Sequence, residues 1–350
     1  MSQPMLKTKK NSKANLKEPK SQSLAHGDHK SVKNIVVRLF RRHAVLLFIA
    51  LLCVFFSFTS PSTFPTLDNM RGIALGQSVS ALLALSVLLV VVIGEFDLSV
   101  GYTLGFSAVV TAKLSGGVRV PVGASILVAL LIGAAIGMLS GVLVARLKVN
   151  SLIATLGVGL AVSGLSVGVS GGQILSTNIP NFIISLSRGR FLGIEGVIWI
   201  LLLVSTVTYL IFVKTPLGQK LYATGGSEVV ARMVGIRVNL LKISVFAVAG
   251  LIAALAGILQ LGLSGAADPS YGSNLLLPAF AAVFLGSTTV RPGFFNVWGT
   301  ILSIILLAVG FSGMSLLGVP FWVQPIFDGF ALIIGVLLSK WSAKNSQGVS

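Results

Sequence analysis

The 350-residue sequence has little charge and a single cysteine, and both scarcities restrict what the protein can be. Charged residues make up 10% of the chain, whereas a soluble domain carries about 25%. A chain of this composition has too little polar surface to hydrate a globule of its size. The lone cysteine, Cys53, lies within an apolar run and excludes any disulfide within the chain.

Histidine and nucleotide-binding motifs are also scarce. The three histidines, His26, His29 and His43, all precede the first apolar run or stand at its start. This position excludes an intramembrane Ser–His hydrolase and a buried histidine-liganded metal site. No GxxxxGK[ST] loop occurs, so the chain should not bind ATP in the P-loop manner. The sequence therefore predicts no catalytic residue, no metal site and no cofactor.

Long apolar runs dominate what remains. Hydrophobic residues make up 54% of the chain, and 39 glycines allow helices to pack closely. Because every backbone polar group in lipid must be paired within its segment, these runs predict helices, and the alternation of a membrane barrel is absent. The expected spans are 44–60, 72–93, 98–115, 121–145, 151–170, 197–213, 241–263, 275–290, 294–312 and 321–338. The fold class is an all-α integral membrane protein of about ten transmembrane helices.

The net charge of +17 is distributed as a topology signal. Residues 1–42 hold 11 of the 26 Lys and Arg residues, and most of the others stand in short gaps between apolar runs. With the N-terminus inside, 21 basic residues lie inside and 5 outside, which favours ten crossings with both termini inside. Eight crossings remain an alternative if two short segments are re-entrant. The basic residues are thus expected to contact membrane lipid, and no nucleic acid.

Three regions follow from this pattern. Residues 1–42 predict a disordered basic cytoplasmic tail, residues 43–340 a transmembrane domain, and residues 341–350 a short cytoplasmic C-terminal tail. Residues 214–240 form a long inner connection. A helical pattern from about Ser227 to Val234 follows Gly225-Gly226 there, with Ser227 as the expected N-cap and Glu228 in the first turn.

Glycine spacing suggests packing faces and an internal repeat. Gly133, Gly137 and Gly141 form a GxxxGxxxG stripe that predicts close helix packing. Glycines seven residues apart bracket two inner breaks, at 94–101 and at 286–293. This spacing fits an inverted repeat of helices 2–5 and 7–10, and it equally fits coincidence in a glycine-rich chain.

Acidic residues within the apolar region are the candidates for a solute path. Glu95 and Asp97 lie between two apolar runs, where Asp97 or Ser99 is expected to cap the next helix, a role that can coexist with contact to a solute. Asp328 lies near the middle of the last segment, where it either pairs with a basic group such as Arg291 or stays neutral.

Three ordered blocks give the chain a family resemblance that covers roughly residues 45–340. The blocks are Gly94-Glu-Phe-Asp-Leu-Ser-Val-Gly101, Asn150-Ser-Leu-Ile-Ala-Thr-Leu-Gly157 and the stretch from Gly218 to Ile236 that contains Tyr-Ala-Thr-Gly-Gly and Ala-Arg. The chain resembles the permease subunits of bacterial ABC importers for monosaccharides, of the ribose, xylose and arabinose type. It departs from the family pattern at Ser151, Leu276, Pro278 and Asp328.

The resemblance implies an ATP-driven sugar importer in the bacterial inner membrane. It implies three partners: a cytoplasmic ABC ATPase, a second permease subunit, identical or different, and a periplasmic sugar-binding protein. The ATPase would dock on the 214–240 loop. The coupling residues that the resemblance assigns are Gly225, Gly226, Ser227, Glu228, Ala231, Arg232 and Gly235.

The polar side chains of the apolar region are the candidates for a solute path. A sugar needs hydrogen bonds without a counter-ion, which favours weakly polar side chains along its path. The candidates are Asp97, Ser99, Asn150, Ser151, Thr155 and Asp328. One alternative is a secondary transporter that couples ions through Glu95, Asp97 or Asp328. A second alternative is an exporter or a membrane scaffold that transports nothing.

Overall fold

The computed structural model describes residues 45–347, with side chains up to Lys340. The tail predicted for residues 1–42 lies outside the described residues. The described chain is mainly helical, and its two short strands, β1 (Arg190–Phe191) and β2 (Ile194–Glu195), pair antiparallel. The prediction of an all-α membrane protein is confirmed at this level.

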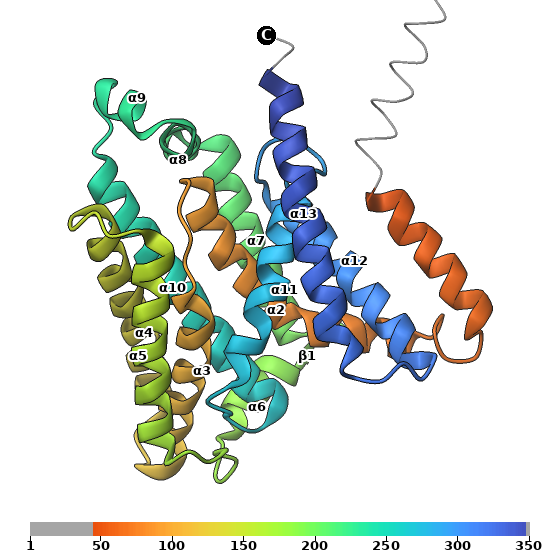
Figure 1. The fold of residues 1–350 in the computed structure, drawn as a ribbon. Helices are drawn as coiled ribbons and strands as arrows, with labels where there is room; N and C mark the ends of the chain where they lie inside the picture. The colour runs from red at the N-terminus through yellow and green to blue at the C-terminus, as the bar shows by residue number, and fades with distance from the viewer. Residues whose placement is uncertain (1–44, 348–350) are drawn as a thin grey trace, which may run out of the picture. The chain divides into compact units, whose positions relative to one another are not determined.

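Each of the ten apolar segments coincides with a helix (Figure 1). The first is Val45–Thr59, and the others are α2 (Leu67–Val92), α3 (Ser99–Ala112), α4 (Val122–Ala145), α5 (Ser151–Ser170), α7 (Gly196–Lys214), α10 (Val238–Ser264), α11 (Tyr271–Gly286), α12 (Val297–Leu316) and α13 (Val323–Gln347). Shorter elements connect them: the π-helical turn η1 (Lys113–Gly117), α6 (Asn181–Arg188), α8 (Pro216–Gly226) and α9 (Glu228–Met233). The tail expected at 341–350 is helical as far as Gln347, because α13 continues past its apolar part.

Length separates these helices into two groups. Among residues 45–347, seven helices are long and apolar enough to cross a membrane, namely α2, α4, α5, α7, α10, α12 and α13 as far as Lys340. The first helix, α3 and α11 are shorter than a full crossing of about 20 residues. Seven candidate spans are therefore established by length and composition, and the count of ten crossings stays a prediction.

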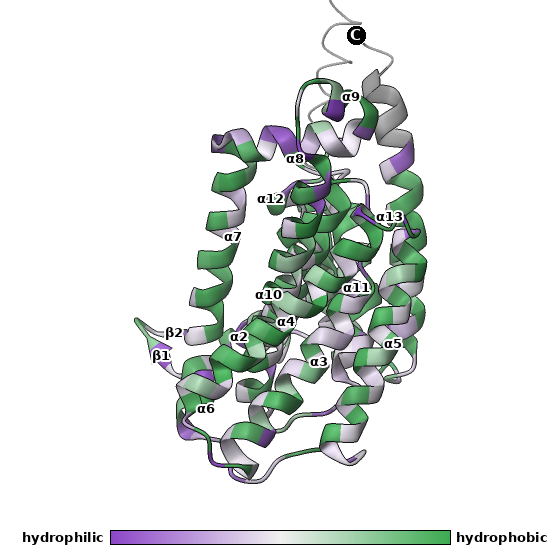
Figure 2. Ribbon diagram, turned by 90° about the vertical axis from the view of Figure 1, so that its left-hand side faces the viewer, coloured by the Kyte–Doolittle hydropathy of each residue, from purple (hydrophilic) through white to green (hydrophobic). Residues whose placement is uncertain are grey.

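Polar residues gather at the two ends of the helices. In Figure 1, α8 and α9 lie at one end, together with the end of α13, whereas α6 and β1 lie at the other. Figure 2 shows hydrophilic residues around α8 and α9 and around α6 and β1, with largely apolar helices between them. The end that carries α8 and α9 is called the coupling end below, and the other end is called the α6 end.

The core is built around α10, whose closest partner is α4. The glycine stripe predicted on α4 faces α10: a Cβ on Gly137 would overlap the carbonyl oxygen of Phe246, and one on Gly133 would overlap Gly250 and Ala254. A Cβ on Gly141 would lie 2.9 Å from the Cα of Ile243 and 3.0 Å from the Cβ of Phe246. Close contact of small residues lets the two backbones gain dispersion energy that larger side chains would prevent. The prediction of a packing face is confirmed.

Substituting Gly137 with alanine should destabilise the protein, although alanine favours a helix by about 1 kcal/mol over glycine. The added methyl group forces α4 away from α10, at a cost of about 1–3 kcal/mol. Gly164→Ala on α5 is the matched control, because no atom lies within 4 Å of its added Cβ. Thermal unfolding in detergent should show a lower midpoint for Gly137→Ala alone. Equal midpoints for the two variants would contradict the packing role.

Candidate functional site

Two capped helices, α8 and α9, form the long connection between α7 and α10 at the coupling end. Thr215 caps α8 by accepting a hydrogen bond from the Gly218 backbone N–H, and Pro216 follows at the first helical position, where its missing N–H costs nothing. Ser227 caps α9 by accepting from the Val230 N–H, as the sequence predicts. Because both helices have their own caps, this connection is a folded unit rather than a loose loop.

The Gly-Gly pair at the end of α8 packs against the end of α2. A Cβ on Gly225 would overlap the carbonyl oxygen of Val92, and Gly94 lies within ordinary contact distance of Gly225. Gly94 has a φ of +80°, a conformation that glycine adopts without strain. Glycines on both sides therefore bring the inner connection directly onto the break between α2 and α3.

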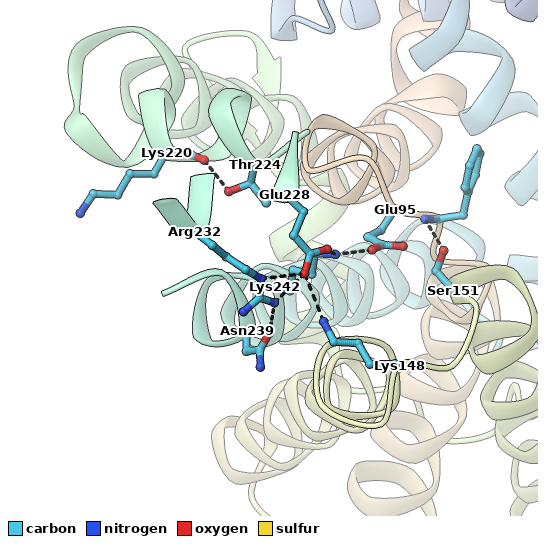
Figure 3. Close-up of polar contacts among 10 residues, drawn as sticks. Glu95, Lys148, Ser151, Lys220, Thr224, Glu228, Arg232, Asn239 and Lys242 are labelled. Atoms are coloured by element: carbon cyan, nitrogen blue, oxygen red, sulfur yellow. Dashed lines mark hydrogen bonds and ion pairs between the residues drawn. The ribbon is translucent and has the colours of Figure 1, made fainter. Parts of the chain in front are cut away.

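Glu228, the first residue of α9, is the centre of an ion cluster (Figure 3). Its carboxylate accepts from Lys148 at 3.1 Å, from Arg232 at 2.5 Å and from Lys242 at 2.7 Å. The hydrogen bonds from Lys242 and Arg232 lower the pKa of Glu228 to about 2. Its carboxylate is therefore ionised throughout the physiological range, and it ties α9 to α10 and to the α4–α5 turn that carries Lys148.

Arg232 completes the fixing of α9. Besides Glu228 one turn earlier, it donates to the side-chain oxygen of Asn239 on α10 at 2.6 Å. Ala231 is the fully buried residue of α9. Gly235 has a φ of +82° where the chain turns toward α10. Gly226 is the last residue of α8. The residues predicted for coupling thus lie together at one end of the molecule.

The break between α2 and α3, residues 94–98, has its backbone groups paired by α5. The Phe96 N–H donates to the Ser151 hydroxyl at 3.3 Å, and the Leu98 N–H donates to the Thr155 hydroxyl at 3.0 Å. These partners compensate for the helical hydrogen bonds that the break lacks. Asn150 caps α5 by accepting from the Leu152 and Ile153 N–H groups.

Asp97 organises the start of α3. Its Oδ1 accepts from the backbone N–H of Ser99 at 2.9 Å and from the Ser99 hydroxyl at 2.6 Å. The Ser99 hydroxyl also lies 3.3 Å from that of Ser140 on α4. Asp97 and Ser99 are both buried. Leu98, not Asp97 or Ser99, is the N-cap residue of α3, and Asp97 instead pairs with the first residue of the helix from the position before the cap.

A cavity of about 610 Å³ lies among α2, α11, α12 and α13. Amide, hydroxyl and carboxyl groups face it alongside aliphatic and aromatic side chains. The polar lining residues are Gln77, Ser80, Tyr271, Ser273, Asn274, Gln324 and Asp328. A second cavity of about 500 Å³ shares Gly76 and Tyr271 with it and is lined by Arg188, Arg190 and Glu195 of the α6 end. Tyr271 therefore lies where the two cavities meet.

Only Asp328 among the predicted path residues lines the large cavity. Asp97, Ser99, Ser151 and Thr155 instead join α3 to α4 and α5, and Asn150 caps a helix. Asp328 also forms no ion pair within the described residues, so the pairing with Arg291 considered from the sequence is wrong. Arg291 lies in the turn between α11 and α12.

Comparison with known proteins decides the family. Residues 69–337 match the family described as branched-chain amino acid transport system / permease component. The ribose import permease of Escherichia coli K12 is 34% identical over 85% of this chain and 92% of its own length. The chain belongs to this permease family. The L-arabinose ABC transporter permease of Azospirillum brasilense is 31% identical over 87% of the chain and 89% of its own length.

The resemblance deduced from the three sequence blocks is thereby confirmed. A further relative of the permease is the xylose transport system permease of Escherichia coli K12, 28% identical over 96% of this chain and 100% of its own length. No solved structure matches the permease. The permease is a membrane-spanning component of an ABC importer and a multi-pass protein of the bacterial inner membrane, and it belongs to a family of transporters rather than enzymes.

Sequence reasoning missed two groups of residues. The sequence predicts no contact for Lys242, although its side chain is 5% exposed and joins Glu228 to Glu95. The sequence also gives no role to the amides of Gln77, Asn274 and Gln324, which line the large cavity. The signal for Lys242 was the presence of a lysine near the start of a long apolar helix. The cavity amides gave no such signal, because the cavity is assembled from four helices.

The Thr155 hydroxyl should be needed for the stability of the break. Thr155→Val leaves the Leu98 N–H without its partner, at a cost of about 1–3 kcal/mol. Thr155→Ser keeps the hydroxyl and is the control. Hydrogen exchange at Leu98 should be faster in Thr155→Val than in the wild type and nearly unchanged in Thr155→Ser. Similar exchange in both variants would show that this hydrogen bond does not hold the segment.

Proposed function

We propose that the permease forms half of a translocation pathway for a monosaccharide, driven by an ABC ATPase docked at α8 and α9. The observation that supports this most is the pairing of a rigid, ion-fixed helix at one end with a polar cavity inside the helices. Relatives named for ribose, arabinose and xylose favour a pentose or a closely related sugar.

The outward side of α9 has the character of a docking surface. Val229, Val230, Met233 and Val234 are all exposed at the coupling end, and Met233 reaches 81% exposure. Apolar side chains grouped in this way mark protein interaction sites. An ATPase with an apolar groove would cover them, while Glu228 and Arg232 keep the helix in position.

The chemistry of the large cavity fits a sugar. Its amides and hydroxyls can both donate and accept hydrogen bonds, as sugar hydroxyls require, and Tyr271 and Phe311 offer apolar ring faces. The Asp328 carboxyl can accept from sugar hydroxyls. A second permease subunit, identical or different, would complete the pathway beside the first.

A periplasmic sugar-binding protein would meet the α6 end. The cavity there contains Arg188, Arg190 and Glu195 and leads through Tyr271 to the large cavity. Delivery at this end and ATPase docking at the other would give the solute a route between the two.

The finer topology belongs to the same proposal: ten crossings, both termini inside and an inverted repeat of helices 2–5 and 7–10. The repeat rests on the seven-residue glycine spacing of the two breaks, each of which contains one glycine with a positive φ, Gly94 (+80°) at the start of the first and Gly293 (+88°) at the end of the second. Gly286 and Gly299 also approach too closely for a Cβ, as Gly101 and Gly272 do. The basic tail 1–42, placed in the cytoplasm, completes the arrangement.

Reconstitution in liposomes tests this function. Uptake of radiolabelled ribose, arabinose and xylose should require ATP, the ATPase and the binding protein, and should not respond to an imposed proton or sodium gradient. Gradient-driven uptake by the permease alone would favour the ion-coupled alternative. Outward movement of solute would favour an exporter.

The apolar surface of α9 should be needed for ATPase binding. Met233→Glu places a charge in the proposed interface, and burial of an unpaired carboxylate is costly. We expect at least a tenfold loss of ATPase copurified with the permease. Met233→Leu keeps the surface apolar and should retain the ATPase. Full binding by the glutamate variant would place the docking surface elsewhere.

A further inference from the structure

Lys242 is a buried lysine shared by two carboxylates from different parts of the chain. Its Nζ donates to Glu228 Oε2 at 2.7 Å and to Glu95 Oε1 at 2.5 Å. Figure 3 shows the lysine between the two acids, with α9 on one side and the 94–98 break on the other. The side chain is 5% exposed, so these two carboxylates replace water as the hydrogen-bond partners of its ammonium group.

The break continues this connection toward the cavity. Phe96, next to Glu95, stacks on two aromatic rings of α11, with centroids 6.1 Å from Phe280 and 6.2 Å from Phe284. A displacement of Glu95 along the chain therefore moves a ring that is wedged against α11. The Phe96 backbone N–H donates to the Ser151 hydroxyl at 3.3 Å.

Helix α11 is built to bend between these rings and the cavity. Pro278 lies inside it and provides no backbone N–H, so one helical hydrogen bond is missing there. Phe280 and Phe284 lie on one side of Pro278, and the cavity-lining Ser273 and Asn274 lie on the other. Movement of one half of α11 can thus tilt the other half.

Taken together, these contacts form a continuous physical path. We propose that Lys242 and Phe96 are positioning residues that transmit movement of α9 to the half of α11 that lines the solute cavity. This proposal rests on the proposed function, because it takes the docked ATPase as the source of the movement. The path runs from Glu228 through Lys242 and Glu95 to Phe96, and then across Pro278 to the cavity.

The ion pairs of Lys242 are better suited to transmitting movement of α9 than to stabilising the fold. A buried ion pair contributes little net stability over an apolar replacement, but it fixes geometry strongly because either partner alone is unfavourable. Lys242 therefore keeps Glu95 and Glu228 at a constant separation. When α9 moves, the break follows it instead of losing contact.

The ratio of sugar taken up to ATP hydrolysed tests the path in the reconstituted complex. Lys242→Met keeps an unbranched apolar stem of similar reach and removes the charge, and Phe96→Leu keeps burial and removes the ring. We expect each to lower the ratio at least tenfold while the ATPase remains bound. The double variant should be no worse than the more impaired single variant, because both residues act in one path.

Lys340→Met is the matched control for the charge. Lys340 is an exposed lysine of α13 outside the proposed docking segment, and its replacement should leave the ratio within twofold of the wild type. A normal ratio in both Lys242→Met and Phe96→Leu would overturn the path. If Lys242→Met fails to insert in the membrane, a normal ratio in Phe96→Leu alone is sufficient to overturn it. Wild-type uptake that needs no ATPase would instead refute the proposed function.

Discussion

The requirement that backbone polar groups be paired in apolar surroundings shapes the centre of this permease. Residues 94–98 interrupt the helical ladder between α2 and α3, and hydroxyls of α5 supply the missing partners at Phe96 and Leu98. The pairing in turn fixes where Glu95 and Phe96 lie. From there, the ion cluster reaches α9 and the aromatic rings reach α11, so both proposed functional regions depend on one paired break.

Close helix packing gives this break a rigid frame. The glycine stripe of α4 brings its backbone against α10, which carries Lys242 at its inner end. The α4–α5 turn next to that stripe carries Lys148, and α5 carries Ser151 and Thr155. Because α4, α5 and α10 are held together in this way, Lys148 of the α4–α5 turn and Lys242 of α10 both reach Glu228.

Several features were predictable because they depend on local sequence. Apolar runs located the ten apolar helices from Val45 to α13, but not the short α6 or η1, since crossing lipid depends on length and composition. The cap at Ser227 followed from residue type and position, as did the packing of Gly133, Gly137 and Gly141. The assignment of the solute path was less successful, because Ser151 and Thr155 are polar for a structural reason that sequence does not distinguish from a binding one.

The sequence by itself determined the membrane class, the positions of the helices, the capped inner connection and the permease family, because each is written in composition, periodicity or contiguous motifs. Only the tertiary structure decided which polar groups meet. Glu95 and Lys242 are 147 residues apart, and Gln77, Asn274 and Gln324 come from three helices. Such contacts depend on helix register and crossing, which are set by packing over the whole bundle rather than by neighbouring residues.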